Sequence, residues 1–204
     1  MDIHIENNME ATILKVAKVQ PEAEESALLT ESDREHLATL SAPARRAQWS
    51  TCRTILREEL GEGAELRYTA SGALVLARPV GEVRYISLSH TEQWVAVMLC
   101  SRRCGVDIES TERNFSRVAS RFISHDERER LESKAGLHFE AIMWSAKEAL
   151  YKYGSNPGLD FIQDIVVTDI DTEQRCLSAE LYGLSTPTIH YEISEGHICC
   201  WVCG

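Results

Sequence analysis

The chain has 204 residues, of which 44% are hydrophobic and 26% are charged, and its formal net charge at pH 7 is -11. This length and composition suit a globular protein with a sizeable core, built as one large domain or two small halves. The negative charge excludes general binding to nucleic acid or anionic lipid, because the average field repels phosphate groups. No apolar run is long enough for a signal peptide or a membrane span, so we expect a cytoplasmic protein with no membrane partner.

The first half of the chain is expected to form helices and then strands. Helical spacing of apolar residues predicts two helices, over 30–40 and 42–61. The apolar period then changes to that of strands, over 64–78 and 83–109. Gly61 is a suitable helix stop, and the first pair of strands is expected to turn near Ser71 and Gly72. The sequence from 30 to 109 therefore predicts an α+β half.

The second half repeats this order. Ser124 with Glu127 three residues later predicts a capping box at the start of a helix over 124–134, and residues 139–154 form the strongest helical pattern. Strand patterns follow from residue 161 to the end of the chain. "YISLSHTEQWVAVMLC" and "YEISEGHICCWVC" look related, which suggests two similar α+β halves, 1–102 and 103–204.

Two carboxylates stand out in "CGVDIES". Asp107 and Glu109 lie two apart in a strand, so their side chains point to the same side and repel each other unless a cation sits between them. On the predicted helix, "WSAKEALYK" places Glu148 next to Lys147 and four residues before Lys152. Three carboxylates with lysines nearby suit Mg²⁺, which prefers oxygen ligands and is usually shared with substrate phosphates.

Each of these residues also has an ordinary structural explanation. Glu148 and Lys152 could form an exposed ion pair, His90 could serve a turn, and Asp107 could cap a strand end. Among the seven cysteines, Cys200 and Cys203 have the spacing of half a zinc site, but no second pair completes it, so structural zinc is not expected.

A basic stripe follows the carboxylate pair. It consists of Arg113, Arg117 and Arg121, which are spaced four apart and are expected to share one face of a helix. The stripe is either a solvated face or a docking surface for an acidic partner.

Four stretches together resemble the 4'-phosphopantetheinyl transferase superfamily. They are "SLSHT" at 87–91, "GVDIE" at 105–109, "RFISHDER" at 121–128 and "WSAKEALYK" at 144–152. The second and fourth fit the family patterns G-[VI]-D-[IV]-E and W-[ST]-x-K-E-[AS]-x-x-K fully, whereas the third fits F-[ST]-x-x-E with a displacement of one residue. The resemblance covers residues 42–165 well and the ends loosely. The length resembles the fused branch, typified by the enzyme that activates surfactin synthetase, which implies two α+β halves packed as a pseudo-dimer, a monomeric state and an active site between the halves.

The resemblance implies transfer of the 4'-phosphopantetheine arm of coenzyme A to a serine of an apo acyl or peptidyl carrier protein, releasing adenosine 3',5'-bisphosphate. It assigns Mg²⁺ to Asp107, Glu109 and Glu148 in the second half. Glu148 is the first choice for the general base and Glu109 the second, and Lys152, or else Lys147, would neutralise the bridging phosphates. Loss of Glu148 would then abolish transfer.

The same resemblance assigns the adenosine 3'-phosphate of coenzyme A to the first half, to residues matching Arg45, Arg46, Arg53, Ser89 and His90. Arginine suits bidentate phosphate recognition, and Arg46 and Arg53 lie two helical turns apart. Most fused members carry Gly-Lys-Pro where this chain has "SGALVL". The missing lysine could weaken coenzyme affinity by about ten- to a hundredfold, unless Arg78 or Arg84 compensates.

The carrier protein is expected to be acidic, and the short branch of the family places carrier-binding basic residues where Arg113, Arg117 and Arg121 lie. Two other functions stay open. One is a non-catalytic homologue that binds carrier proteins, and the other is a different Mg²⁺-dependent enzyme that cleaves a pyrophosphate.

Overall fold

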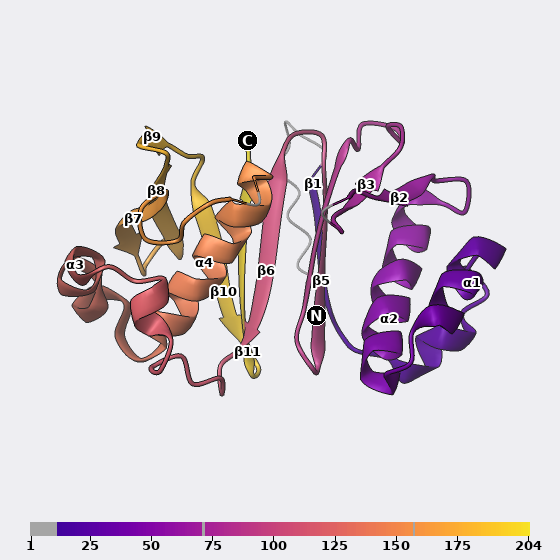
Figure 1. Cartoon of the computed structure of the whole chain (residues 1–204), viewed down its shortest axis with the longest axis horizontal. Coiled ribbons are helices and arrows are strands. Elements are labelled where there is room, and N and C mark those ends of the chain that lie inside the picture. The colour runs from indigo at the N-terminus through magenta and orange to yellow at the C-terminus, as the bar shows by residue number, and fades with distance from the viewer. Residues whose placement is uncertain (1–11, 71, 157) are drawn as a thin grey trace. The chain divides into compact units, whose positions relative to one another are not determined.

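The computed structural model describes residues 12–70, 72–156 and 158–204. The chain divides into two compact units, Met1–Ser101 (unit 1) and Arg102–Gly204 (unit 2). The boundary predicted from the sequence lies one residue later, between 102 and 103. Both units mix helices with antiparallel strands, in agreement with the α+β class (Figure 1). Within the described residues, no helix combines the length and apolar character needed to cross a membrane.

Unit 1 places its helices before most of its strands. Its elements are β1 (Thr12–Lys18), η1 (Pro21–Glu25), α1 (Glu31–Thr39), α2 (Pro43–Leu60), β2 (Leu66–Tyr68), β3 (Leu74–Leu76), β4 (Tyr85–His90) and β5 (Trp94–Cys100). β5 is the central strand of a three-stranded sheet in the order β1-β5-β4, and β2 pairs with β3.

α2 provides the main apolar face of unit 1. It ends at Gly61, whose φ of 78° suits a glycine better than any side chain, as the sequence predicted. Cys52, Leu56 and Leu60 from this helix pack in one core cluster with Val95, Val97 and Leu99 of β5. The predicted hairpin over 64–78 is confirmed by the pairing of β2 with β3, and Gly72 lies in its turn, whereas Ser71 lies outside the described residues.

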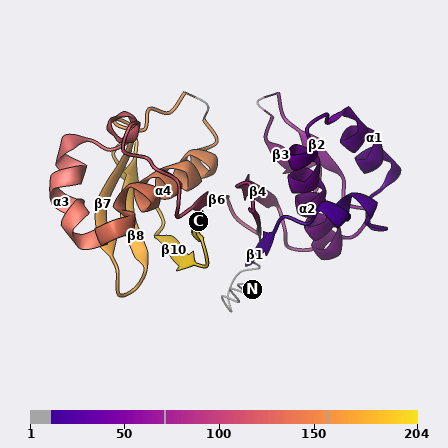
Figure 2. The same cartoon turned by 90° about the horizontal axis from the view of Figure 1, so that it is seen from below.

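Unit 2 contains the larger sheet, which has six strands. Its elements are β6 (Cys104–Ser110), η2 (Ala119–Arg121), α3 (His125–Ala135), η3 (Gly136–His138), α4 (Phe139–Gly154), β7 (Ile165–Asp171), β8 (Cys176–Leu181), β9 (Leu184–Ser185), β10 (Ile189–Ser194) and β11 (His197–Cys203). The sheet runs β6-β11-β10-β8-β7, and β9 pairs with β8. α4 lies across this sheet and packs most closely on β6 and β11 (Figures 1 and 2).

Gly105 explains how α4 can approach β6 so closely. A Cβ atom at this position would lie 2.0 Å from the backbone oxygen of Ala149 and 2.9 Å from the backbone nitrogen of Tyr153. A side chain cannot fit there, so the backbones of the helix and the strand meet directly. The residues of α4 near this contact are thereby brought next to the strand residues that follow Gly105.

Both units share one order of strand pairing. In each, the first strand pairs with the last strand of a C-terminal hairpin: β1 with β5 in unit 1, and β6 with β11 in unit 2. The hairpins β4-β5 and β10-β11 are the two segments whose sequences look related. The two units thus share this order of strand pairing, while the origin as two similar halves and the pseudo-dimer stay predictions.

One predicted element is wrong. Arg113, Arg117 and Arg121 do not lie on one helix, because only the short η2 forms between β6 and α3. Asn114 accepts hydrogen bonds from the backbone and hydroxyl of Ser116, at 2.9 and 2.7 Å, and so favours a turn. All three arginine side chains lie in exposed positions, but they do not form a regular stripe.

Candidate active site in unit 2

Asp107 and Glu109 lie on the face of β6 that α4 covers. Alternation along the strand places them on the same side as Gly105, where the helix backbone makes its close approach. Asp107 is 4% exposed and Glu109 is 9% exposed. Two carboxylates therefore lie side by side in a mostly dry environment, which favours a bound cation.

Lys152 is the nearest cation to Asp107. Its Nζ atom donates to Oδ1 of Asp107 at 2.9 Å and to the backbone oxygen of Val106 at 2.8 Å. Lys152 belongs to the last turn of α4, so this pair joins the helix to the strand. The sequence predicted a site that contains both residues, and the structure brings them together.

Glu109 receives two hydrogen bonds at one oxygen. The indole nitrogen of Trp144 donates to Oε1 at 2.8 Å, and a guanidinium nitrogen of Arg113 donates to the same atom. Burial raises the pKa of Glu109, the bond from Arg113 opposes this shift, and the charge of Asp107 adds to it. Glu109 is thus held in one orientation by a neutral donor and a cation.

Glu148 completes the group of carboxylates. It lies four residues before Lys152 on α4 and is partly buried. Burial, with the nearby charges of Asp107 and Glu109, raises the pKa of Glu148 to about 7, although Lys152 and Arg113 oppose the rise. No described residue forms a hydrogen bond or an ion pair with its carboxyl group. A carboxyl group with this pKa can both accept and release a proton near neutral pH.

The donor set suits a hard divalent cation. Asp107, Glu109 and Glu148 offer only carboxylate oxygens, and burial raises the pKa of Glu148, with the charges of Asp107 and Glu109 adding to the rise. Within residues 12–70, 72–156 and 158–204, however, no three His, Cys, Asp or Glu side chains are already arranged to hold a metal ion. Lys152 and Arg113 instead take oxygens of Asp107 and Glu109. The metal site therefore stays a prediction.

The structure corrects the assignment of Lys147 to a substrate phosphate. Its side chain is 0% exposed, and its Nζ atom lies 2.7 Å from Oε1 of Glu127 and 2.7 Å from the backbone oxygen of Phe161. Glu127 also accepts from the backbone nitrogens of Ser124 and Val167, at 2.8 and 2.9 Å. Lys147 thus holds α4 to α3 and β7 within the core, and we assign it this structural role instead of contact with a phosphate.

In unit 1, the structure brings Arg45 and His90 into contact. A guanidinium nitrogen of Arg45, near the start of α2, meets Nε2 of His90 at the end of β4. Both residues are exposed, and Ser89 beside them is partly buried. This agrees with the expectation that these three residues lie near one another, and their role with coenzyme A stays a prediction.

Arg46 and Arg53 were expected to offer their guanidinium groups to the same phosphate, and the structure gives them other partners. Arg46 donates to Glu24 at 2.9 Å and to the backbone oxygen of Leu37 at 3.0 Å. Arg53 is 5% exposed and lies 3.3 Å from Asp33. Both arginines hold preceding segments to α2, and we correct their assignment accordingly.

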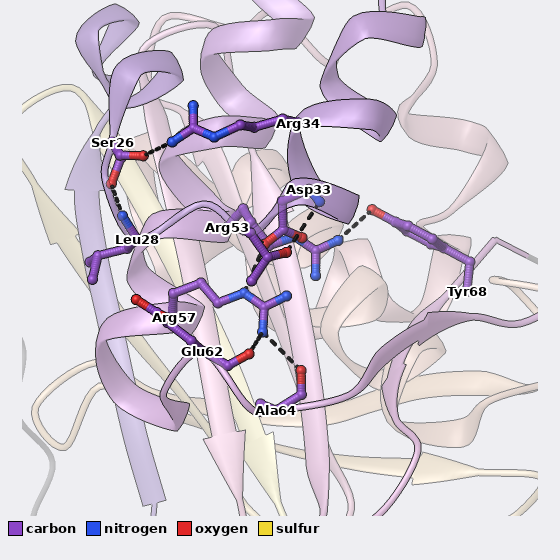
Figure 3. A network of polar contacts seen from close by, with 10 residues as sticks. Ser26, Leu28, Asp33, Arg34, Arg53, Arg57, Glu62, Ala64 and Tyr68 are labelled. Carbon is purple, nitrogen blue, oxygen red and sulfur yellow. Dashed lines mark hydrogen bonds and ion pairs between the residues drawn. The ribbon is translucent and has the colours of Figure 1, made fainter.

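Asp33 explains why Arg53 is directed inward. This carboxylate of α1 also accepts from Arg57 at 2.8 Å, and Arg53 reaches the Tyr68 hydroxyl at 3.5 Å (Figure 3). The Nη1 atom of Arg57 donates to the backbone oxygens of Glu62 and Ala64, at 2.9 and 2.8 Å. The network fastens α1 and the chain before β2 to α2, which is a structural task.

The geometry of unit 2 coincides with a sequence match. Residues 103–202, from β6 to β11, match the family model described as the 4'-phosphopantetheinyl transferase superfamily. Unit 2 is therefore similar in sequence to this superfamily. The matched segment includes every residue of the carboxylate group. A comparison with curated proteins finds no match.

Two residues that contribute to this carboxylate site were not predicted as part of it. Trp144 was read only as a motif residue, yet it lies one helical turn before Glu148 on the same face of α4, and this spacing could have indicated its role. Arg113 was assigned to carrier docking alone. Its position four residues after Glu109 carries no clear signal outside a helix, so only the structure reveals the ion pair.

Proposed function

We propose that this protein transfers the 4'-phosphopantetheine group of coenzyme A to a serine hydroxyl of an apo acyl or peptidyl carrier protein, releasing adenosine 3',5'-bisphosphate. The observation that carries the proposal is the grouping of Asp107 and Glu109 on β6 with Glu148 and Lys152 on α4. This group lies inside the segment that matches the superfamily.

The proposed chemistry is a displacement at phosphorus. The serine oxygen forms a bond to the phosphorus of the pantetheine phosphate, the bond from that phosphorus to the bridging oxygen breaks, and adenosine 3',5'-bisphosphate leaves. Glu148 is the proposed acceptor of the serine proton, and in the metal-free site its pKa of about 7 leaves a large fraction ionised at neutral pH. Lys152 places a positive charge beside the phosphates, which carry the developing negative charge.

Mg²⁺ bound by Asp107, Glu109 and Glu148 would supply charge stabilisation at the pyrophosphate. The chain itself prepares these residues. Trp144 fixes Oε1 of Glu109, and the contact between Gly105 and Ala149 sets the distance between β6 and α4. Arg45, Ser89 and His90 of unit 1 are proposed to take the adenosine 3'-phosphate, where Arg45 contributes a full charge.

The decisive experiment uses intact-protein mass spectrometry. A panel of apo acyl and peptidyl carrier proteins is incubated with the protein, coenzyme A and Mg²⁺, with Glu148→Gln as the matched variant. Each accepted carrier should gain one phosphopantetheine group, and the gain should disappear with the variant and with chelator. Equal gain with Glu148→Gln would remove Glu148 as the base.

A non-catalytic carrier-binding protein is the second candidate. Two observations favour it: "SGALVL" lacks the lysine typical of fused members, and Arg46 and Arg53 bind internal carboxylates. Calorimetric titration of coenzyme A separates the two functions. Coenzyme binding with transfer supports the enzyme, whereas carrier binding without any coenzyme affinity supports the second candidate. Consumption of coenzyme A without an acceptor would instead indicate a pyrophosphate-cleaving hydrolase.

A further inference from the structure

Arg113 occupies an unusual position beside the carboxylate group. Its guanidinium donates to Oε1 of Glu109, the atom that also accepts from Trp144. The guanidinium carbon lies 4.6 Å from the centre of the Phe115 ring and 5.5 Å from that of Trp144. A planar cation is thus held by one carboxylate and two aromatic rings.

The two cations of the site are anchored differently. Lys152 binds the backbone oxygen of Val106 as well as Asp107, and its side chain is 27% exposed. Among the described residues, the side chain of Arg113 forms a hydrogen bond with Glu109 alone, and it is 48% exposed. Arg113 is therefore the cation that can leave with the smaller loss of hydrogen bonds.

The surroundings of Arg113 give it room to move. Its side chain borders a pocket of about 400 Å³ that is also lined by Asn114, Phe115, Leu137 and His138. Leu137 is 95% exposed, so this side of the pocket is open to solvent. A guanidinium released from Glu109 can turn into the pocket without disturbing the core.

The charges of the site decide when such a release is favourable. Three carboxylates, Lys152 and a divalent cation together are neutral, whereas the same set with Arg113 has an excess positive charge. Like charges at short distance repel, most strongly where burial reduces screening by water. The carboxylate group can therefore hold Arg113 or the metal at Glu109 with little charge imbalance, but it holds both poorly.

We propose that Arg113 is the internal counter-cation of Glu109, which a divalent metal displaces when it binds the carboxylate group. This inference rests on the proposed metal site. Arg113 acts as a positioning residue: it keeps Glu109 oriented before the metal arrives and sets the metal affinity by competing for the same carboxylate. Removing its charge should strengthen metal binding, although most changes near a binding site weaken it.

The test measures metal affinity directly, by calorimetric titration of Mg²⁺ and of Mn²⁺ into the full-length protein without coenzyme or carrier. Arg113→Gln should bind either ion roughly two- to fivefold more tightly than the unmodified protein, in line with a half-exposed ion pair. Arg113→Lys keeps the charge and should stay close to the unmodified protein. Arg117→Gln makes the same charge change a few residues away and should leave the metal affinity unchanged.

Tryptophan emission gives a second readout. Mg²⁺ should alter the emission as the guanidinium leaves the Trp144 ring, and this change should be absent in Trp144→Phe and much reduced in Arg113→Gln. Metal affinity that is equal or weaker in Arg113→Gln, or equally strengthened in Arg117→Gln, would overturn the inference while leaving the metal site standing. If neither the unmodified protein nor Arg113→Gln binds a metal, both the inference and the proposed metal site fail.

Discussion

The Nζ atom of Lys152 lies 2.9 Å from Oδ1 of Asp107, and this pair joins the last turn of α4 to β6. The contact combines structure with chemistry. It compensates a carboxylate that is 4% exposed, and it places a positive charge in the group of residues that we propose binds the phosphates.

Lys152→Met should therefore reduce both stability and transfer. We expect a loss of about 1 to 2 kcal/mol in the free energy of unfolding, because a mostly buried carboxylate loses a cation. The transfer rate should fall by about a hundredfold or more, as when one preorganised donor to a developing charge is removed. Urea denaturation and single-turnover kinetics measure the two effects. Lys134→Met, which breaks an exposed pair with Asp169, should change either quantity little.

Glu148 should make the metal-free protein less stable at high pH. Its pKa is about 7 in the folded chain against an ordinary value of 4.5 for glutamate, so folding binds protons between these two pH values. Stability from this group must then fall as pH rises from about 4.5 to 7, and the full penalty persists above that. Glu148→Gln should raise the stability at pH 8 by about 1 to 2 kcal/mol, after allowance for partial exposure, and leave it nearly unchanged at pH 4.5.

Thermal unfolding across this pH range with chelator present measures the difference between the two proteins. Addition of Mg²⁺ should reverse the order at pH 8, since the carboxylate then gains a partner. A constant difference from pH 4.5 to 8 would contradict the raised pKa.

The sequence predicted the elements of both units well where local patterns are strong. The helix over 139–154 coincides with α4, and Ser124 forms the predicted capping box with Glu127 at the start of α3. The prediction of a helix after Glu109 was wrong. The regular spacing of the arginines suggested a helix, whereas Asn114 and the buried Phe115 hold the segment in turns.

The site residues were harder to assign because a sequence shows charge but not its partner. Asp107, Glu109, Glu148 and Lys152 lie near one another in the structure, and their roles in the site stay predictions. Lys147 was assigned to a phosphate because the sequence cannot show that Glu127 lies beside it in the core. The same reason explains Arg53, whose partner Asp33 lies on another helix.

Substitutions in the pair of Lys147 and Glu127 test whether Lys147 stabilises the fold or binds a phosphate of coenzyme A. Lys147→Met should cost about 3 to 5 kcal/mol, because it leaves the buried Glu127 without its cation. Glu127→Gln combined with Lys147→Met should recover part of this loss. Chemical denaturation measures the cycle. At a temperature where Lys147→Met is folded, its coenzyme affinity should equal that of the unmodified protein; weaker coenzyme binding with normal stability would restore the phosphate-binding role.

Gly105 should tolerate no side chain. Gly105→Ala places a methyl group against the backbone of α4, and we expect a loss of about 2 kcal/mol or more in stability. Transfer should also fall, since Glu148 and Lys152 move away from β6 with the helix. Gly63→Ala adds a methyl group in open space and should shift the unfolding free energy by less than about 0.5 kcal/mol. Equal unfolding midpoints for the two variants would show that α4 does not depend on this contact.

Arg117 tests the docking of an acidic carrier. Arg117 is exposed near the carboxylate group in the chain, and a protein of net charge -11 needs a local positive surface to meet an acidic partner. Arg117→Glu should raise the KM for the carrier by about three- to tenfold at low salt, and the difference should shrink above about 0.3 M salt because ions screen exposed charges. Arg175→Glu makes the same charge change in the turn between β7 and β8 and controls for net charge. Steady-state kinetics at several salt concentrations provide the measurement. An unchanged KM and salt dependence for Arg117→Glu would place the docking surface elsewhere. An equal rise in KM for Arg175→Glu would attribute the change to net charge alone.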